Sequence, residues 1–98
     1  MEIKKTEQEK TVILTLAGRL DTTTAPQLEA AVKEALESAD KLVLDFNDLE
    51  YISSAGLRVL LAAHKGMSQK DGLVVRNVCD DIKEVFDITG FSDILTVE

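Results

Sequence analysis

The sequence predicts a single α/β domain with a mixed, mostly parallel sheet of four to five strands, an N-terminal β-hairpin and three to four helices packed on the sheet. Three observations predict it. Short strand-forming runs alternate with helical patterns, as in βαβ units. The 98 residues, 45% of them apolar, suit one modest core. No repeat, low-complexity tract or linker divides residues 1–98.

The chain opens with a predicted hairpin. Residues 2–7 are a weak first strand, and residues 11–16 (TVILTL) are a clear second strand that ends at Gly18. The polar residues 7–10 connect the two. This hairpin makes the sheet mixed, because the later strands are joined by helical crossovers.

A helix is predicted next. Thr24 offers an N-cap, Pro26 falls in the first turn, and Gln27 stands three residues after the cap, which together form a helix-start pattern. The apolar residues then follow helical spacing and form one stripe: Leu28, Ala31, Val32, Ala35 and Leu36.

The middle of the chain is predicted to be a strand, a turn and a second helix. Residues 41–46 are the strand, and the pair Asn47–Asp48 indicates that the chain leaves it there. A helix from Ser54 to about Lys70 follows, with apolar residues at helical spacing: Leu57, Leu60 and Leu61.

The last third repeats this alternation on a smaller scale. Residues 73–75 are a strand, and Asp80 or Asp81 is expected to cap a short helix. Gly90 suits the C-terminal end of that helix, and residues 94–97 are a last short strand.

Composition excludes several functions. The formal charge is −7 and no basic cluster is present, which argues against direct nucleic-acid binding. No signal peptide or membrane span is evident, so we expect a cytoplasmic protein. Cys79 and His64 are the only cysteine and histidine, so no disulfide or Cys/His metal set is expected, and the sequence implies no cofactor.

The pair Ser53–Ser54 stands between a strand and a helix. Either hydroxyl can act as an N-cap, a role worth about 1 kcal/mol, and this is the usual meaning of such a pair. The small residues Ala55 and Gly56 that follow would also let another protein approach one of the hydroxyls closely. The alternative for Gly56 is packing inside the domain, near Tyr51 or the adjacent strand.

Three segments resemble the STAS-domain anti-sigma factor antagonists of bacteria. They are Gly18–Asp21 (GRLD) with the threonines and Pro26 after it, Tyr51–Leu57 (YISSAGL) and Phe86–Phe91 (FDITGF). The resemblance covers essentially all 98 residues and implies a single STAS domain over 1–98. In that family the phosphorylated serine stands two places before the motif glycine. The resemblance therefore implies Ser54 as phosphoacceptor, with Ser53 as the alternative.

The same resemblance implies partners and a contact surface. An anti-sigma factor that is also a serine kinase would bind the unphosphorylated chain, release its sigma factor and then phosphorylate the chain. A metal-dependent serine phosphatase would reset it, and we expect the free chain to be a monomer. The residues expected to contact the partner are Asp21, Thr22, Thr23, Ser53, Ala55, Gly56 and Leu57.

Two features of the motif differ from the family. Ser53 replaces the usual aspartate, and Ala55 replaces a common serine or threonine. A STAS adaptor that is not phosphorylated, working in a signalling or transporter-associated assembly, therefore remains an alternative.

We do not expect an enzyme. Ser54–Ala55–Gly56 matches only half of a hydrolase nucleophile elbow, and His64 would lie about 15 Å along the same helix from Ser54. The chain also lacks a nucleotide phosphate-binding loop, so it would be a kinase's substrate rather than a kinase.

Overall fold

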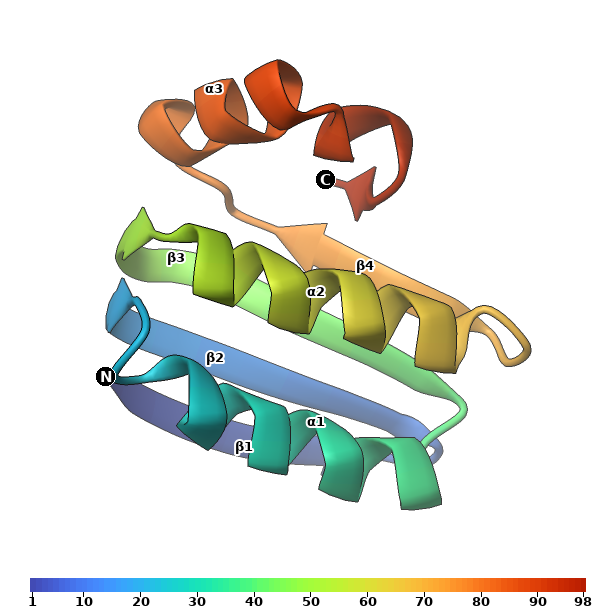
Figure 1. The fold of residues 1–98 in the computed structure, drawn as a ribbon. Helices are drawn as coiled ribbons and strands as arrows, with labels where there is room; N and C mark the ends of the chain where they lie inside the picture. Colours follow the sequence, from blue (N-terminus) through green and yellow to red (C-terminus); the bar gives the residue numbers. More distant parts are fainter.

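The computed structural model describes all residues 1–98, and its elements alternate as the sequence predicts (Figure 1). In chain order they are β1 (Glu2–Gln8), β2 (Thr11–Leu20), α1 (Ala25–Ser38), β3 (Lys41–Ile52), α2 (Ser54–Met67), β4 (Gly72–Arg76), α3 (Asp80–Thr89), a short 3-10 turn η1 (Phe91–Asp93) and β5 (Thr96–Val97). The five strands form one sheet in the order β1-β2-β3-β4-β5. β1 pairs antiparallel with β2 and the other pairs are parallel, which confirms the predicted mixed sheet.

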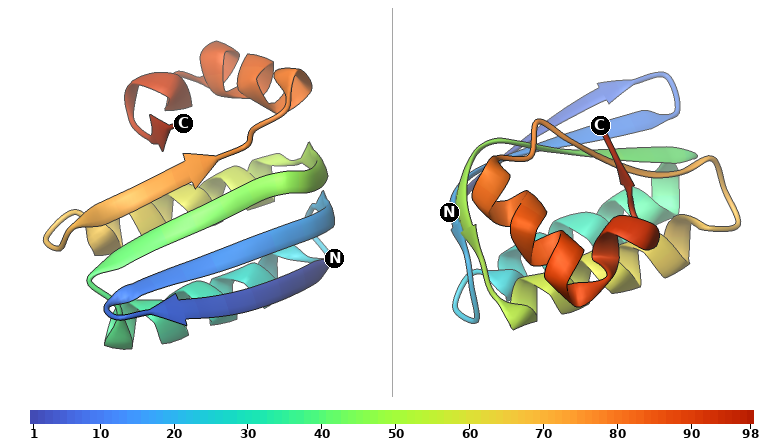
Figure 2. Two further views of the ribbon diagram at one scale, coloured as in Figure 1. Left: turned by 180° about the vertical axis from the view of Figure 1, so that it is seen from behind. Right: turned by 90° about the horizontal axis from the view of Figure 1, so that it is seen from above.

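The helices gather on one side of the sheet. Figure 1 shows α1 and α2 lying side by side across it, both beginning at the end where β2 and β3 finish, while α3 lies beyond β4. Seen from behind, the strands stand in front of these helices and no helix covers them (Figure 2). None of the helices combines the length and the apolar character needed to span a bilayer. The fold therefore presents the starts of α1 and α2 together at one edge.

A single apolar core fills the space between sheet and helices. Along β2, Val12, Leu14 and Leu16 are buried while their neighbours are only half-buried, as expected for a strand with one face on the core. Phe46 on β3 contacts Phe86 on α3 with ring centroids 6.4 Å apart. This aromatic pair fastens α3 to the sheet.

β3 is longer than the sequence predicted. The expectation that the strand ends at Phe46 is wrong, because β3 continues to Ile52. The polar residues that suggested a turn are exposed, but Leu49 and Ile52 beyond them are 3% and 5% exposed and belong to the core. β2 is also longer than predicted and ends at Leu20 rather than Gly18.

A β-bulge allows β3 to continue through its exposed polar residues. Thr15 pairs with Asp45 but Ala17 pairs with Asp48, so β3 contains one more residue than β2 over this stretch. The Asp45 carboxylate accepts a hydrogen bond from the Asn47 backbone N–H at 3.0 Å and holds the bulge. A second shift in register follows nearer the end of the strand.

The helix ends correct three smaller expectations. The Thr24 side chain stands at the N-cap of α1 but makes no capping hydrogen bond. The N-cap of α3 is Cys79, with Asp80 and Asp81 in the first turn instead, where their charges suit the helix dipole. α2 ends at Met67, short of the predicted Lys70.

The C-terminal end is partly as predicted. Gly90 adopts the left-handed conformation (φ 83°) at the end of α3, which confirms its expected role. The last strand begins at Thr96 rather than Ile94, because residues 91–93 form the 3-10 turn first.

Candidate functional site: the start of the second helix

Two neighbouring parallel strands end together and bring two loops side by side. The backbone N–H of Ser53 donates to the carbonyl oxygen of Leu20 at 2.9 Å, so the chain entering α2 is tied to the end of β2. The loop from Asp21 to Thr24, which leads into α1, therefore lies beside the first turn of α2. Both segments therefore lie at the carboxyl edge of the parallel strands.

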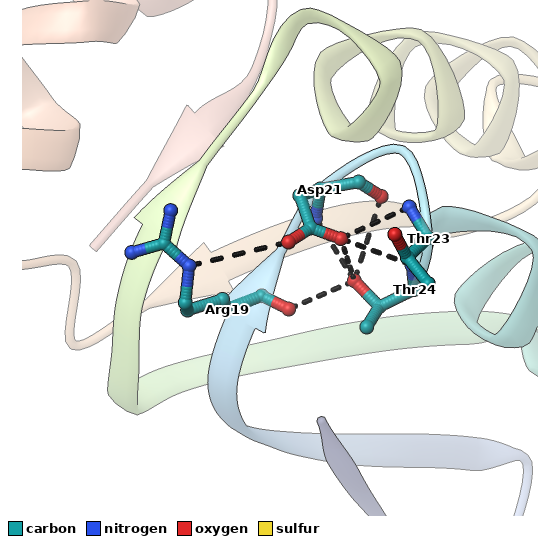
Figure 3. Close-up of polar contacts among 4 residues, drawn as sticks. All are labelled: Arg19, Asp21, Thr23 and Thr24. Carbon is teal, nitrogen blue, oxygen red and sulfur yellow. Dashed lines mark hydrogen bonds and ion pairs between the residues drawn. The ribbon is translucent and has the colours of Figure 1, made fainter.

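Asp21 organises its own loop (Figure 3). One carboxylate oxygen accepts the backbone N–H groups of Thr23 at 3.0 Å and Thr24 at 3.1 Å. The Thr24 hydroxyl donates to the Arg19 carbonyl at 2.8 Å and accepts the Asp21 N–H at 2.9 Å. The hydrogen bond from the Thr24 backbone is the largest of the effects that lower the pKa of Asp21, outweighing partial desolvation. The loop is thus held in one conformation by a charged acceptor.

The two candidate phosphoacceptors differ in environment. Ser54 is the first residue of α2 and is exposed. Ser53 occupies the N-cap position and is half-buried, and its hydroxyl oxygen is buried without any hydrogen-bond partner. Neither serine therefore behaves as the simple capping residue that the pattern most often indicates. Only Ser54 presents its hydroxyl to an approaching protein.

The remaining residues predicted to contact a partner fall into two groups. Asp21, Thr22, Thr23 and Ala55 are exposed or half-buried at this edge. Gly56 and Leu57 are buried, and the space beside Gly56 is filled by the side chains of Leu20 and Ile52. Gly56 thus serves packing inside the domain and gives no room for an outside backbone. These two residues position Ser54 rather than offer a surface.

Arg19 and Tyr51 are absent from the list of residues predicted to contact a partner, although Arg19 differs from the acidic residue often found there in the family and was expected to affect a contact near Asp21. The Arg19 guanidinium lies 4.2 Å from the centre of the Tyr51 ring, and its Nε is 4.0 Å from an Asp21 carboxylate oxygen. Tyr51 is 41% exposed. The two side chains are neighbours because Arg19 pairs with Tyr51 in the β2–β3 register after the bulges. No local pattern in the sequence indicates that register.

A shallow hollow of about 280 Å³ separates the first turns of α1 and α2. Its lining is mixed: Thr22, Ala25, Pro26, Glu29, Ala55, Arg58 and Val59. It lies next to Ser54 along α2. Its lining includes one acidic side chain, Glu29, and one basic side chain, Arg58. Arg58 is a third site residue that the sequence analysis did not include.

Similarity to known proteins identifies the family to which this chain belongs. The family model described as "Mlab, STAS domain" matches residues 3–96, nearly the whole chain. The chain belongs to the STAS-domain family of anti-sigma factor antagonists, which confirms the family resemblance and the fold expected from it.

Two anti-sigma factor antagonists are similar in sequence to this chain over most of its length. The chain is 40% identical over 88 residues to the putative anti-sigma factor antagonist BtrV of Bordetella bronchiseptica, covering 88% of this chain and 76% of BtrV. It is 33% identical to the anti-sigma-B factor antagonist of Listeria monocytogenes, covering 100% of this chain and 87% of that one.

Solved structures share the fold. The unphosphorylated form of the anti-sigma factor antagonist SpoIIAA has a TM-score of 0.84 at 19% identity, over 99% of this chain and 88% of that chain. The phosphorylated form of SpoIIAA from Bacillus has a TM-score of 0.77 at 19% identity, over 99% of this chain and 91% of that chain.

Proposed function

We propose that this anti-sigma factor antagonist works by partner switching. Unphosphorylated, it binds an anti-sigma factor that has serine kinase activity and so releases a sigma factor. The kinase transfers the γ-phosphoryl group of ATP to the Ser54 hydroxyl, ADP leaves, and the hydroxyl proton passes to the kinase's base. The phosphorylated chain then dissociates until a metal-dependent serine phosphatase removes the phosphate. All of this would take place in the cytoplasm, with the free chain a monomer.

The observation that carries this proposal is the exposed Ser54 hydroxyl on a rigid edge. The start of α2 is tied to β2, and the adjacent loop is held by the Asp21 carboxylate. Free backbone N–H groups and the helix dipole at this position favour an added anion by about 0.3–1 kcal/mol. Phosphorylation would thus leave the fold intact.

The effect of the phosphate would then fall on the interface. It adds a charge of about −1.5 to −2 and three strongly hydrated oxygens to a surface that had matched a hydroxyl. A penalty of about 2.8 kcal/mol in binding free energy corresponds to a hundredfold weaker complex. That is enough to exchange one partner for another. The existence of SpoIIAA structures in both forms supports a fold that accepts the modification.

The direct test is intact mass after incubation with the cognate kinase and Mg-ATP. We expect one added phosphate in the wild type and in Ser53→Ala, and none in Ser54→Ala. Binding of the kinase, measured by calorimetry without ATP, should persist in Ser54→Ala and fall at least about tenfold in Ser54→Asp. An unmodified wild type, or phosphate that remains in Ser54→Ala, would contradict the assignment.

The adaptor alternative has one observation in its favour. The residues on both sides of Ser54 are Ser53 and Ala55, where the family's phosphorylation motif commonly has other residues. A constitutive adaptor would bind its partner equally well as wild type and as Ser54→Asp, and no kinase would add mass to it. The same two measurements therefore separate the two functions.

A further inference from the structure

Arg58 is the one arginine without an acidic partner. The sequence contains three arginines. Arg19 lies 4.0 Å from the Asp21 carboxylate, and Arg76 lies 3.2 Å from the Asp45 carboxylate. Arg58 is exposed and forms no ion pair. In a chain with a net charge of −7, an unpaired guanidinium beside the candidate modification site is notable.

The helix places Arg58 within reach of Ser54. The two residues are at positions i and i+4, so their Cβ atoms are about 5–6 Å apart on one face of α2. Long side chains on a helix lean toward its N-terminus, so the Arg58 stem is directed back over the turn that begins with Ser54. The planar fork of N–H donors on arginine suits two phosphate oxygens at once.

The acidic side chain that lines the hollow together with Arg58 already has a basic partner. Glu29 of α1 lines the same hollow, but its carboxylate lies 3.5 Å from the Lys33 ammonium. The first turn of α2 contains no acidic side chain. A phosphate dianion on Ser54 would therefore be the strongest acceptor available to the Arg58 guanidinium.

We propose that Arg58 receives the phosphate on Ser54, so that the modification both adds an anion at the start of α2 and withdraws Arg58 from the hollow between α1 and α2. This inference rests on the proposed phosphorylation of Ser54. Phosphorylation would then change two surface features together, because the partner would meet neither the Ser54 hydroxyl nor a free Arg58 guanidinium. A partner that contacts both would then discriminate between the two forms more sharply than the phosphate alone allows.

The test uses the chain with phosphoserine encoded genetically at position 54, so no kinase is needed. Phosphorus NMR titration gives the pH midpoint of the phosphate's second ionisation. With Arg58→Gln we expect the midpoint to rise by about 0.5 pH unit, a roughly threefold change in proton affinity, because the cation that favours the dianion is gone. Arg58→Lys should fall between Arg58→Gln and wild type. Lys83→Gln, which removes an exposed charge from α3, is the matched control and should leave the midpoint unchanged.

A second readout reports contact rather than charge alone. The Arg58 side-chain Nε–H resonance should shift when position 54 changes from serine to phosphoserine and should follow the phosphate titration, whereas that of Arg76 should not. Equal midpoints for wild type and Arg58→Gln, or an Arg58 resonance that ignores the phosphate, would overturn the inference.

This failure is distinct from failure of the proposed function. If the kinase phosphorylates Ser54 but the titration midpoints of wild type and Arg58→Gln are equal, the proposed partner switching is retained and the proposed role of Arg58 is wrong. If no kinase modifies Ser54 while encoded phosphoserine does contact Arg58, the contact is real but the proposed regulation is not.

Discussion

Gly56, in the first turn of α2, lies so close to Leu20 at the end of β2 that an added Cβ would stand 2.7 Å from the Leu20 Cγ. Ile52 would be 2.9 Å away on β3. Both neighbours are core residues, with 0% and 5% exposure, so neither has room to move aside. The close approach sets how the start of α2, and with it Ser54, sits against the strand ends.

Gly56→Ala should therefore destabilise the domain. Overpacking of about 1–3 kcal/mol exceeds the gain of up to about 1 kcal/mol in helix propensity. Gly66→Ala, on the same helix, is the matched control: its Cβ would meet the terminal methyls of the half-buried Leu36, which can shift. Urea unfolding should show a loss for Gly56→Ala and little change or a gain for Gly66→Ala. Equal stability of the two variants would show that Leu20 yields.

Ser53→Ala distinguishes a capping serine from the buried hydroxyl that the structure contains. A cap lost to alanine costs about 1 kcal/mol. A buried hydroxyl without a partner instead imposes a desolvation penalty of about 1–3 kcal/mol, which alanine removes. We expect the free energy of unfolding to stay the same or increase in chemical denaturation, with Ser54→Ala as the exposed control. A clear decrease for Ser53→Ala alone would show that the hydroxyl is satisfied in solution.

Asp21 should govern the order of the loop beside Ser54. Asp21→Ala removes the carboxylate acceptor of the Thr23 and Thr24 amides, whereas Asp21→Asn keeps an oxygen in the same place. The Thr24 amide also donates to the Asp21 backbone carbonyl at 3.2 Å, and this acceptor remains in both variants. In Asp21→Ala, hydrogen exchange should therefore be much faster at the Thr23 amide and moderately faster at the Thr24 amide, whereas in Asp21→Asn both should be only slightly faster. If both amides exchange as slowly in Asp21→Ala as in wild type, the carboxylate does not hold the loop.

Asp45 should make part of the stability depend on acid pH. Burial disfavours its charge, but hydrogen bonds from Asn77, from the Asn47 backbone and from Arg76 outweigh this and lower the pKa of Asp45 below 3.8. The folded state therefore binds this proton less readily than the unfolded chain. The stabilisation is present above about pH 4 and is lost as the pH falls through the folded-state pKa.

The variant that tests this is Asp45→Asn. At pH 7 we expect it to be less stable than wild type by about 1–2 kcal/mol, because the charged acceptor at the β3 bulge is lost. We would measure the free energy of unfolding by urea between pH 7 and pH 3. The values for wild type and Asp45→Asn should converge as the pH falls below 3.8. A difference that stays constant over this range would mean that the Asp45 charge contributes nothing.

Local patterns were sufficient for much of the fold. The run at residues 11–16 marks β2, the apolar stripe beginning at Leu28 marks α1, and Gly90 marks the end of α3, because each depends on side-chain periodicity or on backbone conformation within a few residues. The helix start at the serine pair was found in the same way. The family motif then identified which serine to consider first.

Contacts between distant segments decided the rest. β3 continues past Asn47 and Asp48 because β2 supplies backbone partners through a bulged register, and no window of β3 alone contains that information. The loop before α1 is held by the Asp21 carboxylate, although Thr24 was the local candidate for its cap.

The sequence by itself determined the order of strands and helices, the family and a serine pair at a helix start, since these follow from short-range pattern and motif. Only the tertiary structure decided that Ser54 is exposed while the Ser53 hydroxyl is buried, that Gly56 packs on Leu20, and that Arg19 stacks on Tyr51. The physical reason is that burial and strand register arise when separate segments pack together, so no single segment specifies them.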